Sequence, residues 1–163
     1  MVRILRHLFM PPWLVRRYFS RAVMARIEHA ISESEALHNG EIRFAVESVL
    51  DLSPLLHGQD ARQRAMEVFS QLRVWDTEHN SGVLIYLLLA DRDVEIVADR
   101  GIHAKVGNAE WERICRQMEA AFHAGRFEEG VLAGMRKVTA LLVRHFPVKT
   151  DNPNELSDQP VVL

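Results

Sequence analysis

The stretch from residue 80 to residue 102, N-S-G-V-L-I-Y-L-L-L-A-D-R-D-V-E-I-V-A-D-R-G-I, constrains the fold of this chain more than any other. Residues 83–90 are apolar without interruption, and residues 94–99 alternate between apolar and polar after the turn Asp91-Arg92-Asp93. This pattern predicts a β-hairpin. Because a continuously apolar strand is usually buried on both faces, helices must cover both sides of its sheet.

The rest of the chain predicts one more strand and several helices. Residues 41–47 alternate strictly, which is typical of a half-buried strand. Helices are predicted over residues 21–38, capped by Ser20, and from Asp60, which forms a capping-box pattern with Gln63. Two further helices are predicted, one opened by Asn108 as its cap and one over residues 126–145. The expected fold class is α/β: a small mixed β-sheet, built from a strand-helix-strand unit plus the hairpin, sandwiched by helices on both faces with Rossmann-like layering.

Composition narrows the possible functions. The 163 residues are expected to form one domain, and 48% hydrophobic residues are enough for a core. The single cysteine, Cys115, excludes an internal disulfide and a multi-cysteine zinc site, and its apolar helical surroundings predict an inert buried thiol. A net charge of −2 gives no reason to expect a nucleic-acid partner.

The chain is expected to divide into a basic arm (residues 1–19), a domain (residues 20–146) and a disordered tail (residues 147–163) rich in Pro, Asn and Asp. No acidic residue precedes Glu28, and the arm mixes arginines with Leu5, Leu8, Phe9 and Trp13. This composition suits an anionic membrane surface, although the arm could instead pack on the domain or dock a partner. Pro11-Pro12 prevents one continuous helix. Without a spanning segment or a signal peptide, we expect a cytoplasmic protein, peripheral to the inner face of the membrane.

Four carboxylates are predicted to gather where the strands end. Glu47 and Asp51 follow the first strand, and Asp91 and Asp93 flank the hairpin turn. Ligands of open α/β sheets bind at the carboxyl ends of the strands, and converging oxygens suit Ca²⁺ or Mg²⁺. Crowded carboxylates could also raise one pKa for general acid catalysis, while a polar turn without any site is the third interpretation. No glycine-rich phosphate loop follows either strand, so no nucleotide cofactor is expected.

The hairpin stretch resembles the core signature of the TPM domain family. The strand that begins Gly40-Glu41-Ile42-Arg43, the helix ending near Trp75 and Trp111 on a later helix fit its shorter bacterial branch. The resemblance covers residues 26–146. It implies an α/β sandwich, and the family includes a thylakoid-lumen protein described as an acid phosphatase, membrane-anchored members and bacterial proteins reported to bind Ca²⁺. Many bacterial members are encoded beside a LemA-type membrane protein, which the resemblance implies as a partner.

Three functional hypotheses follow. The first is a non-enzymatic interaction or regulatory module that binds a divalent cation at the carboxylate edge. The second is a metal-assisted acid phosphatase using the same edge. The third is a peripheral membrane adaptor acting through residues 1–19. The chain lacks a nucleophile motif such as G-x-S-x-G, which favours the first hypothesis.

Overall fold

The computed structural model describes residues 2–11, 13–148 and 152–163. Met1, Pro12 and residues 149–151, which belong to the predicted arm and tail, lie outside the described residues. A four-stranded sheet has the order β3-β2-β1-β4. The strands are β1 (Glu41–Glu47), β2 (Gly82–Leu88), β3 (Asp93–Ala98) and β4 (Val161–Val162).

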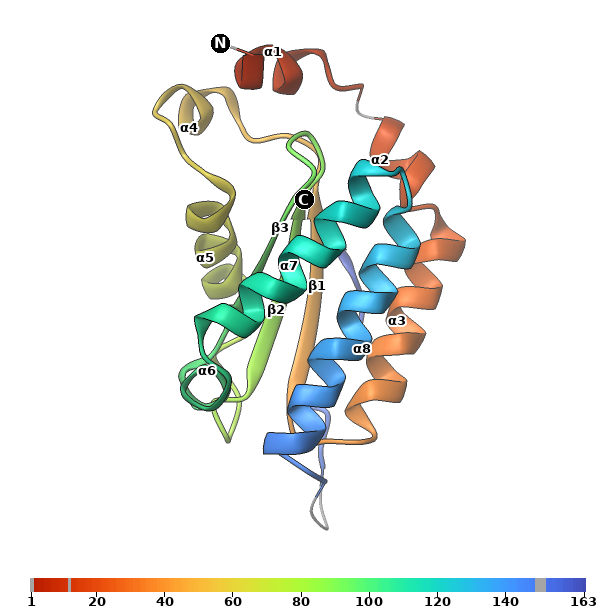
Figure 1. Cartoon of the computed structure of the whole chain (residues 1–163), viewed down its shortest axis with the longest axis vertical. Helices are drawn as coiled ribbons and strands as arrows, with labels where there is room; N and C mark the ends of the chain where they lie inside the picture. Colours follow the sequence, from red (N-terminus) through yellow and green to blue (C-terminus); the bar gives the residue numbers. More distant parts are fainter. Residues whose placement is uncertain (1, 12, 149–151) are drawn as a thin grey trace.

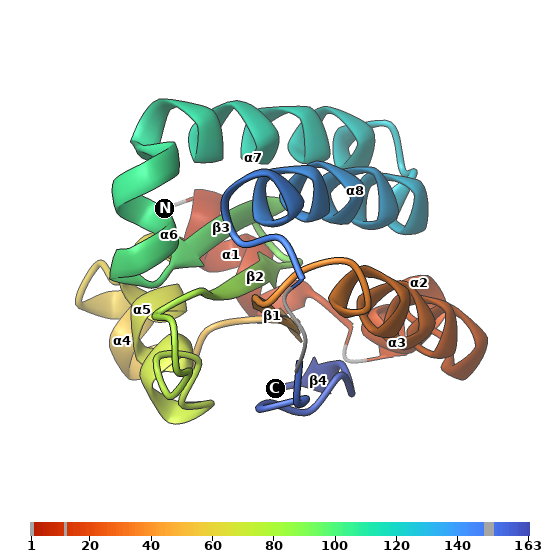
Figure 2. The same ribbon diagram turned by 90° about the horizontal axis from the view of Figure 1, so that it is seen from below.

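The predicted fold class is confirmed. β1 and β2 pair in parallel, and β3 returns antiparallel to β2 through the hairpin. Helices lie on both faces of the sheet, with α7 and α8 on one side and α4 and α5 on the other (Figures 1 and 2). The helices are α1 (Val2–Phe9), α2 (Trp13–Tyr18), α3 (Arg21–Glu35), α4 (Leu52–Leu56), α5 (Ala61–Gln71), α6 (Arg100–Val106), α7 (Asn108–His123) and α8 (Phe127–His145).

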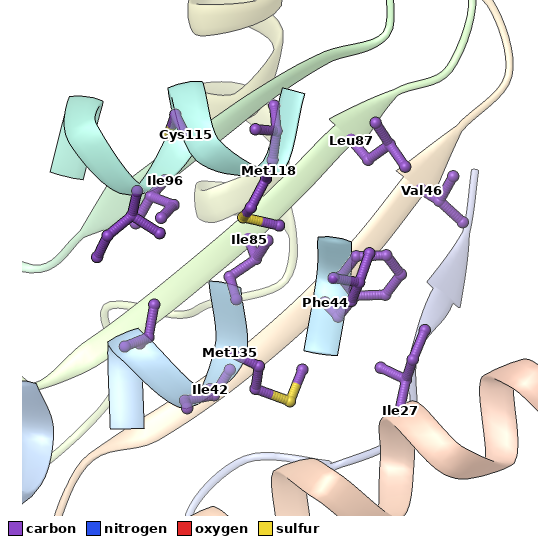
Figure 3. Packing of buried hydrophobic residues seen from close by; sticks show 14 of the residues in the cluster. Ile27, Ile42, Phe44, Val46, Ile85, Leu87, Ile96, Cys115, Met118 and Met135 are labelled. Atoms are coloured by element: carbon purple, nitrogen blue, oxygen red, sulfur yellow. The ribbon is translucent and has the colours of Figure 1, made fainter. Parts of the chain in front are cut away.

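Two apolar cores follow from the period-two alternation of the strands. On the face toward α3, α7 and α8, Phe44 and Ile85 pack with Met118 and Met135, as Figure 3 shows. On the opposite face, α5 packs against the alternate residues of β2. Burying these side chains removes a large apolar area from water, which is the main stabilising contribution to such a domain.

β1 differs from the half-buried strand that its alternation predicts, because all seven of its residues are buried. The polar face carries Glu41, Arg43 and Glu47, each less than a tenth exposed. α5 and the residues after 151 cover this face, so its polar groups are held by protein atoms in place of water. The period-two pattern therefore identified two faces correctly but did not reveal that both are covered.

Residues 152–163, hereafter the strap, differ from the disordered tail that their composition predicts. They run alongside β1 and end in β4, which pairs in parallel with Ala45 and Val46 (Figure 2). Leu156 and Val161 pack against the core on the α5 side. The strap thus covers the part of the sheet that α5 does not reach.

The helix caps and element boundaries predicted from the sequence were partly correct. Ser20 caps α3 by accepting the N–H of Val23, and the capping box of Asp60 and Gln63 is present. The second arm of the hairpin ends earlier than the alternation suggests, because Asp99 caps the helix α6. The helix cap expected at Asn108 is absent: Asn108 is the first residue of α7 and Gly107 precedes it. A short helix, α4, lies between β1 and α5 and was not among the predicted elements.

We expect Gly82→Ala to destabilise the domain strongly. A Cβ at this first residue of β2 would lie 1.9 Å from the carbonyl oxygen of Val74, and backbone cannot move away easily. The expected loss is roughly 3 kcal/mol in the free energy of unfolding, measured by urea denaturation. Gly134→Ala is the control, because the three atoms nearest to the new Cβ there all belong to the flexible side chain of Met118, which can change rotamer. Equal losses for the two variants would contradict this explanation.

Candidate functional site

Glu47 is the last residue of β1, and both of its carboxylate oxygens accept hydrogen bonds from other side chains of the protein. Tyr86 Oη donates a hydrogen bond of 2.6 Å to its carboxylate. Arg64 of α5 donates to both carboxylate oxygens, with Nε at 2.9 Å and Nη2 at 3.1 Å. Burial, together with this carboxylate, raises the pKa of Tyr86, so the phenol remains a donor. Glu47 and Arg64 thus form a partly buried ion pair between the sheet and α5, and Tyr86 is hydrogen-bonded to it.

Asp91, in the hairpin turn, attaches the N-terminal helix to the domain. Arg3 Nε donates to its carboxylate at 2.8 Å, and Arg6 lies within 3.7 Å. His7 is buried, and its Nδ1 accepts the N–H of Leu50 at 3.0 Å. The neutral ring therefore carries its proton on Nε2, which lies 3.3 Å from the Asp91 carboxylate. In Figure 1, α1 lies across the end of the molecule beside the tip of this hairpin.

The other two predicted ligands have different surroundings. Asp51 is exposed and precedes α4 without making a side-chain cap. Asp93 begins β3, where burial raises its pKa to about 6, with Glu95 and Asp91 adding to the effect. The carboxyl of Glu119 is within hydrogen-bonding reach of Asp93. Across residues 2–11, 13–148 and 152–163, no three His, Cys, Asp or Glu side chains are arranged to hold a metal ion. Metal binding at this edge stays a prediction.

The helix α1 turns Arg3 and His7 toward the domain and most of its apolar residues toward solvent. Arg3 and His7 face Asp91, as described above. Four of its five apolar residues are exposed, with Val2 71% and Phe9 79% accessible and Leu5 and Leu8 about half, while Ile4 packs against the core on the α5 side. A helix that packs on a core usually buries most of its apolar residues, whereas α1 buries few of them. Exposed apolar side chains grouped on one helix are a candidate interaction surface.

A second group of buried ionisable residues lies beneath the strap. Burial is the largest cause that raises the pKa of Glu35 to about 9 and that of Glu41 to about 7, and the negative charge of the strap's Asp158 contributes to both shifts. Burial also lowers the pKa of His38 to about 4, consistent with Nδ1 accepting the N–H of Gly40. Arg43, between the two glutamates, has its pKa lowered by burial. Exclusion of water disfavours the charged form of each of these groups, and the Arg43 guanidinium nevertheless stays protonated.

Comparison with known protein families shows to which family this chain belongs. A model of the TPM domain family matches residues 16–141, most of the chain. The chain belongs to the TPM domain family. The NMR structure of the BA42 protein from the psychrophilic bacterium Bizionia argentinensis is similar to this TPM domain with a TM-score of 0.77 and 29% identity. That similarity covers 88% of this chain and 94% of the other.

A second solved structure shares the fold of this TPM domain. It is the solution NMR structure of the N-terminal domain of a protein from P. gingivalis, with a TM-score of 0.62 and 18% identity. The match covers 80% of this chain and 82% of that one. Among proteins with curated descriptions, none matches the sequence.

Sequence reasoning selected Glu47 and Asp91 but missed their partners. Arg3 and His7 are separated by one helical turn, a spacing that could have indicated a shared helix face. Arg64, by contrast, lies on a helix whose docking angle no local pattern specifies. The buried thiol of Cys115 was anticipated correctly: burial raises its pKa to about 12.

We expect Asp91→Asn to loosen α1 without unfolding this TPM domain. The substitution removes the negative charge that attracts Arg3 and Arg6, and a partly exposed ion pair contributes less than about 1 kcal/mol to stability. Amide hydrogen exchange in α1 should therefore accelerate several-fold, while exchange in β2 stays unchanged. Asp51→Asn, at an exposed carboxylate, is the matched control. Unchanged exchange in α1 would show that Asp91 does not hold the helix.

We expect stability to fall as pH rises from about 6 to 9. Glu35 and Glu41 have folded pKa values above the usual 4.5, so the folded state binds more protons than the unfolded chain in that range. Glu35→Gln imitates the protonated side chain, and at pH 8 it should be more stable than the parent protein by roughly 1 to 3 kcal/mol. Glu28→Gln, exposed on the same helix, should have no such effect in urea denaturation. A free energy of unfolding that does not change with pH in this range would refute the raised pKa values of Glu35 and Glu41.

Proposed function

We propose that this TPM domain is a non-enzymatic interaction module that attaches to an anionic membrane surface through α1 and α2. The observation that carries the proposal is the orientation of α1. Arg3 donates to Asp91 and His7 accepts the N–H of Leu50, whereas four of the five apolar residues of α1 are exposed to water and only Ile4 packs against the core. A short helix that presents apolar side chains outward beside basic ones has the composition of an interfacial anchor.

The basic residues of α1, α2 and the first turns of α3 have the sign of charge that phosphate headgroups attract. Arg3 is paired with Asp91, and Arg26 is paired with Glu128. Arg16, Arg17 and Arg21 are exposed, and no ion pair involving them is present among the described residues. Each basic residue near an anionic surface contributes about 1 kcal/mol to attachment. Trp13, more than half exposed at the start of α2, supplies an aromatic ring of the kind that favours the interface.

The proposed attachment is to the membrane surface and does not require a helix that spans the membrane. Of the helices in the described part of the chain, none is both long and apolar enough to cross a membrane. The inner face of the membrane and a LemA-type partner stay predictions. So do Ca²⁺ or Mg²⁺ binding and metal-assisted acid phosphatase activity at the carboxylate edge. A cation there would compete with Arg3 for Asp91 and with Arg64 for Glu47.

Vesicle binding tests the proposal. In co-sedimentation with vesicles containing about a third anionic lipid, we expect Leu8→Ser combined with Phe9→Ser to weaken binding at least tenfold, because both apolar side chains are lost from the interface. Arg16→Glu combined with Arg17→Glu should weaken binding similarly and remove most of its salt dependence.

Trp75→Ser is the matched control, because Trp75 is half exposed but lies outside the arm. It should bind vesicles like the parent protein. Wholly zwitterionic vesicles should bind all variants weakly. If the arm variants and the parent protein bind anionic vesicles equally, the arm is not the attachment surface.

A further inference from the structure

The strap is docked on the domain at several points along its length. The side-chain amide of Asn152 donates to the backbone carbonyl of Glu35 at 2.7 Å. The carboxylate of Glu41 accepts the backbone N–H groups of Glu155 and Leu156, both at 3.1 Å. At its far end, β4 pairs with the outer edge of β1. The docked strap therefore separates the ionisable groups beneath it from water.

One buried oxygen beneath the strap has no hydrogen-bond donor. Glu35 Oε1 accepts the backbone N–H of Ile42 at 2.7 Å. Glu35 Oε2 is also buried, and no N–H or O–H group among the described residues donates to it. The carboxyl of Asp158, on the strap, is within hydrogen-bonding reach of the Glu35 carboxyl. Two ionised carboxylates this close would repel each other where water is excluded, so one proton lies between Glu35 and Asp158.

Arg43 of β1 reduces this repulsion but does not remove it. Its guanidinium attracts the negative charges of Glu35 and Asp158 and donates to the backbone carbonyl of Ser157. Glu41, on the same strand, is a third carboxyl beside both. One guanidinium does not balance three ionised carboxyls, so full ionisation beneath the docked strap would leave uncompensated negative charge away from water.

Two further titratable groups among the described residues lie nearby, and neither supplies a positive charge. Glu155 of the strap adds negative charge beside Glu41. Burial lowers the pKa of His38, which follows α3, to about 4, so its ring is neutral above that pH. Burial is also the largest cause that raises the pKa of Glu35 to about 9. When the strap leaves, water gains access and Asp158 moves away, so both causes of the raised pKa weaken.

We propose that the strap is a pH-sensitive element of the fold, whose docking takes up the proton held between Glu35 and Asp158 and which rising pH releases from β1. The docked state binds more protons than the undocked state, so docking is favoured at low pH and is lost as the pH rises toward 9. Each pH unit in this range changes the docking equilibrium by up to about tenfold. Release uncovers the outer edge of β1. The inference does not depend on membrane attachment through the arm.

Amide hydrogen exchange of the full chain, measured by NMR at pH 6.5 and 8.5, tests the proposal. Each exchange rate is divided by the intrinsic rate at the same pH, which gives the opening constant of that amide. We expect the opening constants of Glu155 and Leu156 to rise at least tenfold between the two pH values. At both, they should exceed the opening constant of Ile85 in β2 at least tenfold. Equal values for all three amides would mean that the strap leaves only on global unfolding, and would overturn the proposal.

Variants of the two carboxyls identify the proton. Glu35→Gln keeps an acceptor for Ile42 and supplies an N–H for Asp158, so the opening constants of the strap amides should change less than threefold between pH 6.5 and 8.5. Asp158→Asn supplies an N–H for ionised Glu35 and should lower these constants at pH 8.5 at least threefold. Glu28→Gln is the matched control on α3 and should retain the pH dependence of the parent protein. A Glu35→Gln chain that retains it would overturn the assignment.

The carboxyl ¹³C resonance of Glu35 gives a direct measurement that needs no variant. At pH 6.5, with the strap docked, it should have the chemical shift of a protonated acid, whereas the exposed Glu28 should be ionised. An ionised Glu35 in the docked chain at that pH would show that no proton is held against Asp158, and would overturn the proposal.

Discussion

The parallel pairing of β1 with β2 is the constraint on which the rest of this TPM domain depends. The two strands are in register from Glu41 and Gly82 to Glu47 and Leu88, and every residue in both is buried. A strand pair without a solvated face requires a cover on each side. The crossover between the strands supplies α5 for one face, and the segments before β1 and after β3 supply α3, α7 and α8 for the other.

The two faces of the sheet differ in polarity, so the segments that cover them make different kinds of contact. The face toward α7 and α8 is apolar, so helices with apolar stripes suffice. The opposite face of β1 carries Glu41, Arg43 and Glu47, whose desolvation is costly unless each finds a polar partner. Arg64 and Tyr86 provide partners for Glu47, and the backbone of the strap provides them for the other two. An apolar helix in place of the strap would leave these charges buried and unpaired.

Features that depend on interactions between residues close in sequence were predictable from the sequence, and features that depend on residues far apart in sequence were not. The hairpin, the caps at Ser20 and Asp60 and the α/β class depend on spacing within a few residues, and all were predictable. The strap was not, because its Pro, Asn and Asp residues have no periodicity and its partners lie far away in sequence. The site was predicted in part: Asp91 and Glu47 were selected, but the cations that hold them come from α1 and α5. Only the tertiary packing brings those groups together.

The late position of β4 in the sequence has a consequence for folding. β2 can pair with β1 through a local crossover, whereas the partner of Ala45 and Val46 on the outer edge lies at the far end of the chain. Long-range pairings close late, since the loop entropy must be overcome first. Until then β1 is an open edge strand with free N–H and C=O groups and apolar neighbours, which other chains can extend. The rate at which the strap docks therefore sets how long each newly folded molecule remains prone to aggregation.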